Sequence, residues 1–137
     1  MKNLFVPYEI ALKLKEKGFE PSCFASYEGN DDLCFRTVMS KNSYYISEEE
    51  DKYYCAAPLY QQCIDWFRKK HNIHVNADLL PNVKEYKGTF VPLDFTPKSF
   101  KSVIEYYNAR IKYSTTDKFT NYYEALTAAI EEAIKLI

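Results

Sequence analysis

Residues 58–77, PLYQQCIDWFRKKHNIHVNA, contain the two patterns that decide the fold. Pro58 suits the start of a helix, and apolar side chains then recur at the three- and four-residue spacing of a helix with one buried face. Three basic residues before Asn72 complement the negative end of the helix dipole. From Ile73 onward apolar and polar residues alternate, which is typical of a strand with one buried face. The stretch therefore predicts a central helix over 58–71, followed directly by a strand.

Towards the N-terminus, the sequence predicts a helix, a strand and a hairpin. A proline and the spacing of apolar residues predict the helix over 7–17, and Gly18 followed by an apolar residue marks its end. A β-prone segment after a run of turn-forming residues predicts a strand over 33–39. Two tyrosine-containing segments, 44–46 and 53–55, flank an acidic stretch and predict a hairpin with a solvated tip.

Towards the C-terminus, the sequence predicts a further strand around 89–91 and a last helix over 121–136, which Asn121 and Glu124 begin in the manner of a capping box. Residues 97–113 fit either one helix or a helix followed by a strand, and the alternation at their end favours the division. Together these elements predict one α+β domain that covers the whole chain. A mostly antiparallel sheet of about four to five strands would pack against three main helices.

The composition excludes several classes of protein. The chain has 137 residues, of which 47% are hydrophobic, enough for a core that needs neither metals nor disulfides. Its 18 basic and 19 acidic residues give a net charge of -1, unlike a polycation or a disordered acidic chain. No apolar run approaches the roughly 20 residues that span a bilayer, and the N-terminus lacks the apolar core of a signal peptide. We therefore expect a cytoplasmic protein without membrane association, whose four cysteines are reduced thiols.

Three blocks of sequence occur together in this chain: LFVPYEIA at 4–11, APLYQQ at 57–62 with DWFR at 65–68, and YYEAL at 122–126. In combination they resemble a family of small uncharacterised proteins that are encoded in phages and prophages of Bacteroidetes. The resemblance implies an intracellular protein of mobile-element origin with α+β character. It implies no catalytic or binding residues.

The reactive side chains do not form a recognisable catalytic or metal-binding pattern. Cys55, Cys63, His71 and His74 are of the types that bind zinc, but their spacing departs from the usual short ligand pairs. Cys63 and His71 lie about two helical turns apart, roughly 12 Å, too far for a direct proton transfer. The acidic run at 48–51 lacks the glycine and the ligand spacing of a calcium loop. We therefore expect no enzymatic activity, no cofactor and no metal; a small enzyme built on a cysteine or a carboxylate is a less favoured alternative.

Tyrosine is the outlier of the composition, with 13 residues, and it occurs in pairs at 44–45, 53–54, 106–107 and 122–123. Adjacent rings point to different sides of a strand or helix, so we expect one ring to pack and its neighbour to be exposed. These rings either fill a small core or form a contact surface, since exposed tyrosine is enriched at protein interfaces. The sequence favours a non-enzymatic phage or prophage accessory protein that binds an unidentified protein, or a second copy of itself, through such a surface. The candidate interface residues are Tyr44, Tyr53, Tyr106 and Tyr113.

A nucleic-acid-binding module is the alternative function. Residues 65–118 carry ten basic and six acidic residues, and aromatic rings in such a segment can stack on bases while lysines hold the phosphates. The whole chain contains only three arginines and no known RNA-binding signature, so this alternative is not favoured. Its candidate contacts are Lys84, Lys87, Lys98, Lys101, Arg110 and Lys112.

Overall fold

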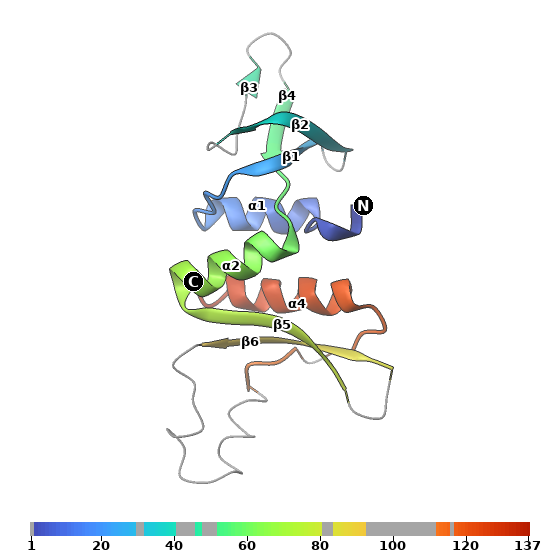
Figure 1. Ribbon diagram of the computed structural model, residues 1–137. Coiled ribbons are helices and arrows are strands. Elements are labelled where there is room, and N and C mark those ends of the chain that lie inside the picture. The colour runs from blue at the N-terminus through green and yellow to red at the C-terminus, as the bar shows by residue number, and fades with distance from the viewer. Residues whose placement is uncertain are drawn as a thin grey trace. The chain divides into compact units, whose positions relative to one another are not determined.

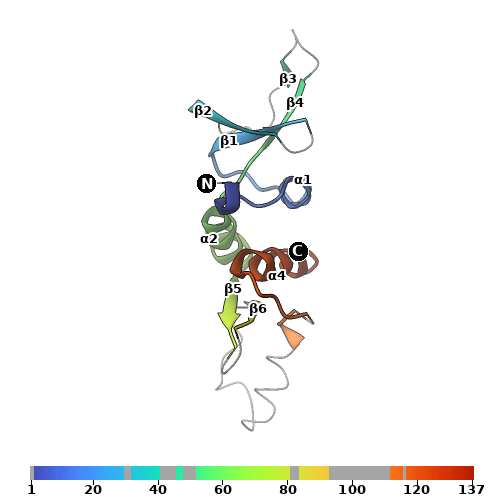
Figure 2. The same cartoon turned by 90° about the vertical axis from the view of Figure 1, so that its right-hand side faces the viewer.

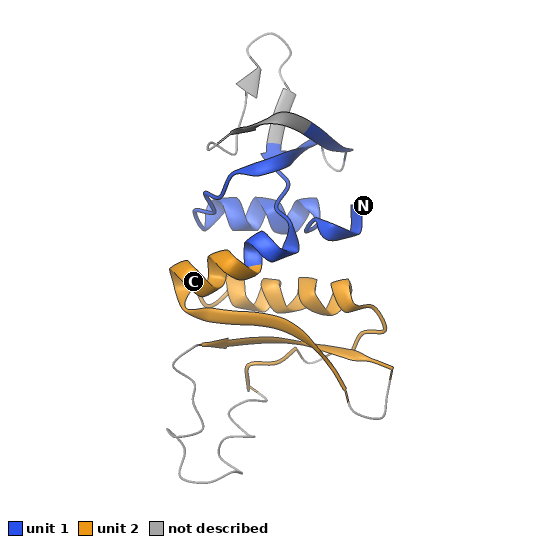
Figure 3. Cartoon of the chain, viewed as in Figure 1, with its two compact units in different colours: residues 1–63 blue, residues 64–137 orange. Residues whose placement is uncertain are grey.

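The computed structural model describes residues 2–29, 32–40, 46–47, 52–80, 84–92, 112–115 and 117–137. For residues 36–40, 46–47 and 52–54 it describes the backbone alone. The chain divides into two compact units, residues 1–63 and 64–137 (Figure 3). The sequence predicts one domain over residues 1–137, and this stays a prediction.

The described residues form the following elements in chain order: η1 (Lys2–Leu4), α1 (Tyr8–Glu16), β1 (Cys23–Glu28), β2 (Asp32–Ser40), β3 (Ile46–Ser47), β4 (Lys52–Ala56), α2 (Tyr60–His71), β5 (Ile73–Leu79), β6 (Tyr86–Pro92) and α4 (Tyr122–Ile134). The predicted α+β class with mostly antiparallel pairing is confirmed. The strands fall into two sheets instead of the single sheet predicted: one has the order β2-β1-β4-β3, and the other consists of β5 and β6. The reason is that β5 and β6 pair with each other along their whole length, within their own unit.

Strand β1 is the element that the sequence patterns do not predict. It lies between β2 and β4 and runs antiparallel to both. Four of its six residues are buried, so it lacks the alternation by which a strand is recognised. The predicted strand over 33–39 is confirmed as β2, and the predicted hairpin is confirmed as the β3–β4 pair, in which Ile46 lies opposite Tyr53. The acidic tip at 48–51 lies outside the described residues.

Helix α1 and the turn after it follow the predicted pattern. Its buried face consists of Ile10, Ala11 and Leu14. Gly18 has a φ of 78°, and the N–H of Phe19 donates to the carbonyl of Leu14 at 3.0 Å. The helix therefore ends in a left-handed turn, and the ring of Phe19 is buried after it, as the sequence predicts.

Helix α2 begins at Tyr60, later than the predicted residue 58, because Leu59 is held outside the helix. Leu59 forms an antiparallel bridge with Phe5, and its N–H donates to Gln62 Oε1 at 2.9 Å. The helix ends at His71, and Asn72, with a φ of 57°, leads the chain directly into β5. Asparagine is one of the few residue types that adopt this left-handed conformation readily.

In the second unit, α4 packs on one face of the hairpin formed by β5 and β6 (Figures 1 and 2). The strands pair from Ile73 opposite Pro92 to Leu79 opposite Tyr86. Burial alternates along β5, which confirms the predicted alternation, and its buried side chains share the face that α4 covers. At Gly88 of β6 the helix lies so close to the hairpin that a Cβ atom would overlap the first turns of α4.

The start of α4 is set by a side-chain cap, as the sequence predicts. Asn121 has an extended backbone, and its Oδ1 accepts a hydrogen bond from the N–H of Tyr123 at 2.8 Å. The helix then runs over Tyr122–Ile134 and buries one continuous apolar face. Most of the segment predicted as a helix and a strand over 97–113 lies outside the described residues; Lys112 and Tyr113, at its end, are not in a strand.

Candidate functional site

Three tyrosines of the second unit form a cluster, here called the tyrosine patch: Tyr86, Tyr122 and Tyr123. The ring of Tyr122 contacts the ring of Tyr86 edge-to-face at 5.7 Å between centroids, and that of Tyr123 at 5.4 Å. The backbone of Tyr86 exchanges two hydrogen bonds with that of Phe119. Tyr122 and Tyr123 belong to the first turn of α4, which Asn121 caps. Local backbone structure therefore positions all three rings.

The tyrosine patch is partly open to solvent and carries charges of both signs around it. Tyr122 keeps 37% of its surface exposed. Lys118 Nζ lies 3.8 Å from Glu85 Oε2. The exposed Glu124 follows Tyr123 in α4. Because neither sign dominates, the patch suits a protein surface better than a polyanion.

The predicted interface tyrosines are not the ones that form this patch. Tyr113 is half-buried, and its ring contacts Phe90 edge-to-face at 6.3 Å. For Tyr53 only the backbone, on β4, is described, and Tyr44 and Tyr106 lie outside the described residues. The repeated tyrosine at 122–123 was a signal for the patch, but its contact with Tyr86 depends on packing between distant segments.

The predicted nucleic-acid contacts are only partly described. Lys84 is exposed, and Lys112 places its Nζ 5.8 Å from the ring centroid of Tyr113. Lys87 lies opposite Asp78, on the face of the hairpin away from α4, whereas its neighbour Tyr86 faces α4. The remaining three, Lys98, Lys101 and Arg110, lie outside the described residues.

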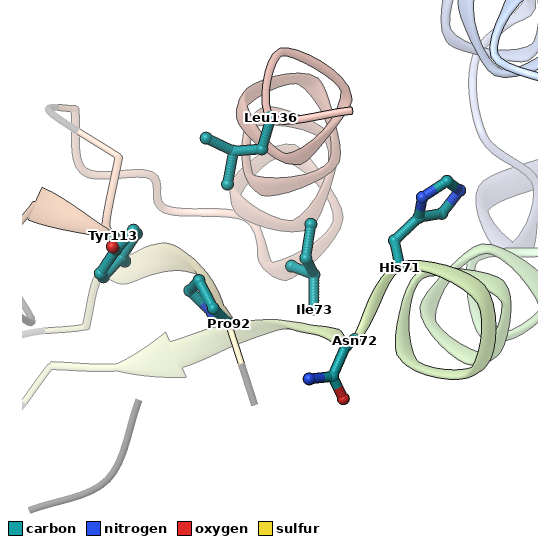
Figure 4. A pocket seen from close by; sticks show the side chains of 6 residues that line it. All are labelled: His71, Asn72, Ile73, Pro92, Tyr113 and Leu136. Carbon is teal, nitrogen blue, oxygen red and sulfur yellow. The ribbon is translucent and has the colours of Figure 1, made fainter. Parts of the chain in front are cut away.

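A pocket of about 360 Å³ lies near the other end of α4 (Figure 4). Apolar side chains of Ile73, Pro92 and Leu136 line it. Asn72 and Tyr113 add an amide and a phenol, and His71 stands at the end opposite Tyr113. Among these described lining residues there is no carboxylate or thiol to work with the imidazole. The lining thus mixes apolar and polar groups.

The surroundings of His71 at the pocket lower its pKa. Its ring packs edge-to-face on Trp66 at 4.4 Å, and its Nε2 is enclosed without a hydrogen-bond partner among the described residues. Burial, with a smaller effect from the neighbouring Lys70, lowers the pKa of the imidazole from its usual 6.5. The fold therefore favours neutral His71.

We expect the free energy of unfolding to fall as the pH is lowered through about 6.5, because the unfolded chain then binds a proton that folded His71 resists. Phenylalanine retains an aromatic ring on Trp66 but does not titrate, so His71→Phe should weaken this dependence between about pH 7 and pH 5. Denaturant titrations of both proteins at a series of pH values measure the effect. An unchanged slope in the variant would contradict it.

Three of the four thiols in the first unit have raised pKa values. None of the four cysteines forms a disulfide. Burial raises the pKa of Cys23 to about 12 and that of Cys55 to about 11, and it holds that of Cys63 well above its usual range. Since the thiolate is the nucleophile, the raised pKa values disfavour reaction of these three groups at neutral pH. Cys34 is less buried, and its S–H donates to Glu28 Oε2 at 3.4 Å.

Alkylation should therefore distinguish the cysteines. With iodoacetamide at neutral pH, we expect the folded protein to be modified first at Cys34, whereas Cys23, Cys55 and Cys63 should react only after denaturation. Mass spectrometry of peptides from the folded and denatured protein gives the site of each modification. Equal rates at Cys63 and Cys34 in the folded protein would show that Cys63 is accessible as a thiolate.

The structure gives no support to a metal centre or a membrane span in the part of the chain that it describes. No group of three or more cysteine, histidine or acidic side chains is placed to hold a metal ion there. Cys55 and Cys63 belong to the first unit, and His71 and His74 belong to the second. None of the described helices is both long and apolar enough to cross a bilayer. Comparison with known proteins identifies no relatives: no family model, no curated protein and no solved structure matches this chain.

Proposed function

We propose that this chain is a non-enzymatic accessory protein of a phage or prophage and that it binds another protein through the tyrosine patch. The observation that carries the proposal is the edge-to-face contact of Tyr122 with both Tyr86 and Tyr123 at a partly exposed position. Rings held in this way lose little further freedom on binding, and the exposed ring of Tyr122 offers a contact surface to a partner. The resemblance of three sequence blocks to those of phage-encoded proteins is the reason for proposing this origin.

A protein partner is favoured over nucleic acid by the distribution of charge. The patch has Lys118 and Glu85 close together beside it, and Lys87 is on the opposite face of the hairpin from Tyr86. Binding of single strands normally combines stacked rings with an uninterrupted basic groove. Such a groove is not assembled around the patch by the described residues.

The test is affinity capture from host cells with the wild-type protein and two tyrosine variants. Tyr122→Ser removes the central ring of the patch, and Tyr8→Ser, in α1 of the first unit, is the matched control. We expect the wild type and Tyr8→Ser to retain a partner that Tyr122→Ser loses, and a titration of the purified partner should show the same order of affinity. Equal retention by all three proteins would refute the role of the patch. Binding of single-stranded nucleic acid at low salt, weakening steeply as salt rises, would favour the alternative function.

A further inference from the structure

Strand β5 has a regular outer edge. In the described part of the chain its one strand neighbour is β6, and the seven residue pairs between them contain no bulge. Proline and bulges are common devices that prevent an edge from pairing with another chain, and β5 contains neither. A seven-residue edge of this kind is a template for an additional strand.

We propose that a second copy of this chain pairs with β5 in antiparallel orientation about a twofold axis at Asn76. The two hairpins then form one four-stranded sheet with the order β6-β5-β5-β6. This register pairs all seven residues of each strand, because Asn76 is the middle residue of β5. It also places both α4 helices on the same face of the combined sheet, since directly opposite residues of antiparallel strands share a face.

Hydrogen-bond complementarity selects this register. His74 and Asp78 lie on the face of β5 away from α4, and the twofold axis places each imidazole opposite the carboxylate of the other copy. The carboxylate is held in place, because it accepts hydrogen bonds from Asn76 Nδ2 at 2.9 Å and from Thr89 Oγ1 at 3.2 Å. If one strand were shifted by two residues, Asp78 would lie opposite Asn72 or Asn76 of the other copy. Both His74–Asp78 pairs would then be lost. A shift of one residue would place the two helices on opposite faces of the sheet.

The same register covers the most exposed large apolar side chain of the described residues. Leu79 is 61% exposed and shares the face of β5 that α4 covers. In the pairing it lies opposite Ile73 of the second copy, which lines the pocket. Each copy thus brings an exposed leucine against an apolar residue at the pocket, and the contact occurs twice because the interface is symmetric. The inference is argued from β5 and not from the rings of the tyrosine patch, although Leu79 lies opposite Tyr86.

Engineered cysteines test the register. In a Cys34→Ser background, Asn76→Cys places two thiols directly opposite each other, within the Cα separations that a disulfide bridges. His74→Cys, on the same face of the same strand, is the matched control, because the two copies of residue 74 would be four residues out of register. We expect mild oxidation to give a covalent dimer with Asn76→Cys and far less with His74→Cys. Equal cross-linking of the two variants, or none at residue 76 in a folded dimer, would overturn the proposal.

Sedimentation of the full chain tests the interface without relying on Asn76. We expect the wild type to form dimers and Leu79→Asp to raise the dissociation constant more than about tenfold, because an apolar contact is lost twice. Leu4→Asp is the control, since Leu4 is also exposed, at 46%, but belongs to the first unit. A wild-type protein that is monomeric at every concentration, or a dimer that both variants affect equally, would overturn the proposal.

Discussion

Replacement of Gly88 by alanine is expected to lower the free energy of unfolding by about 3 kcal/mol or more. A Cβ at this position would lie 2.8 Å from the Cβ of Ala129 and 2.9 Å from Cγ2 of Thr115, and still closer to the carbonyl oxygen of Ala125. That oxygen belongs to the backbone of α4, so it cannot rotate away as a flexible side chain would. The methyl group therefore forces the helix off the hairpin and loosens the core between them.

Denaturant unfolding followed by tryptophan fluorescence measures this effect, because Trp66 is the only tryptophan and is buried in the same unit. Gly29→Ala is the control. Gly29 has a φ of 64°, and a Cβ there would meet nothing within 4 Å, so the substitution introduces backbone strain of about 1–2 kcal/mol without a clash. A Gly88→Ala protein as stable as the wild type would show that α4 does not approach β6 so closely.

Replacement of Leu126 by alanine is expected to lower the free energy of unfolding by about 2–5 kcal/mol. Leu126 is 1% exposed on the apolar face of α4, and its truncation removes buried surface and leaves a cavity. Leu136→Ala is the matched control just beyond the same helix, where the side chain is 49% exposed. Because less buried surface is lost there, we expect a change below about 1 kcal/mol.

The same fluorescence-detected titrations compare the two leucine variants. If their free energies of unfolding fell equally, the face of α4 that includes Leu126 would not be the one packed on the hairpin. A larger loss for Leu136→Ala would assign the C-terminal end of the chain a structural role that its exposure does not indicate.

Local periodicity explains which elements could be predicted from the sequence. Each α-helix among the described residues buries one face, and β5 buries alternate residues, so their apolar spacing indicates both the element and its orientation. Strand β1 is buried at most of its positions, so apolar and polar residues do not alternate along it and do not indicate a strand. Local periodicity could not predict that the strands divide between two sheets. The division depends on which strands pair with each other, and the pattern within one strand does not show this.

The candidate site was predictable only in its chemistry. The abundance and pairing of tyrosines indicated a contact surface, and Tyr122–Tyr123 was among the pairs. The choice of individual residues requires the tertiary contact between Tyr86 and Tyr122, which come from a strand and a helix far apart in the chain. The pocket presents the same difficulty, since Ile73, Tyr113 and Leu136 come from three separate segments.

The boundary between the two compact units falls inside α2, between Cys63 and Ile64, and not in a loop. Recombination between related genes usually preserves a fold when it joins segments at an exposed, irregular connection. An exchange at residue 63 would instead divide a hydrogen-bonded helix and leave a single turn on one side, too short to be helical by itself. The two halves of this gene are therefore expected to be inherited together, and fragments made for separate study should each retain all of Tyr60–His71.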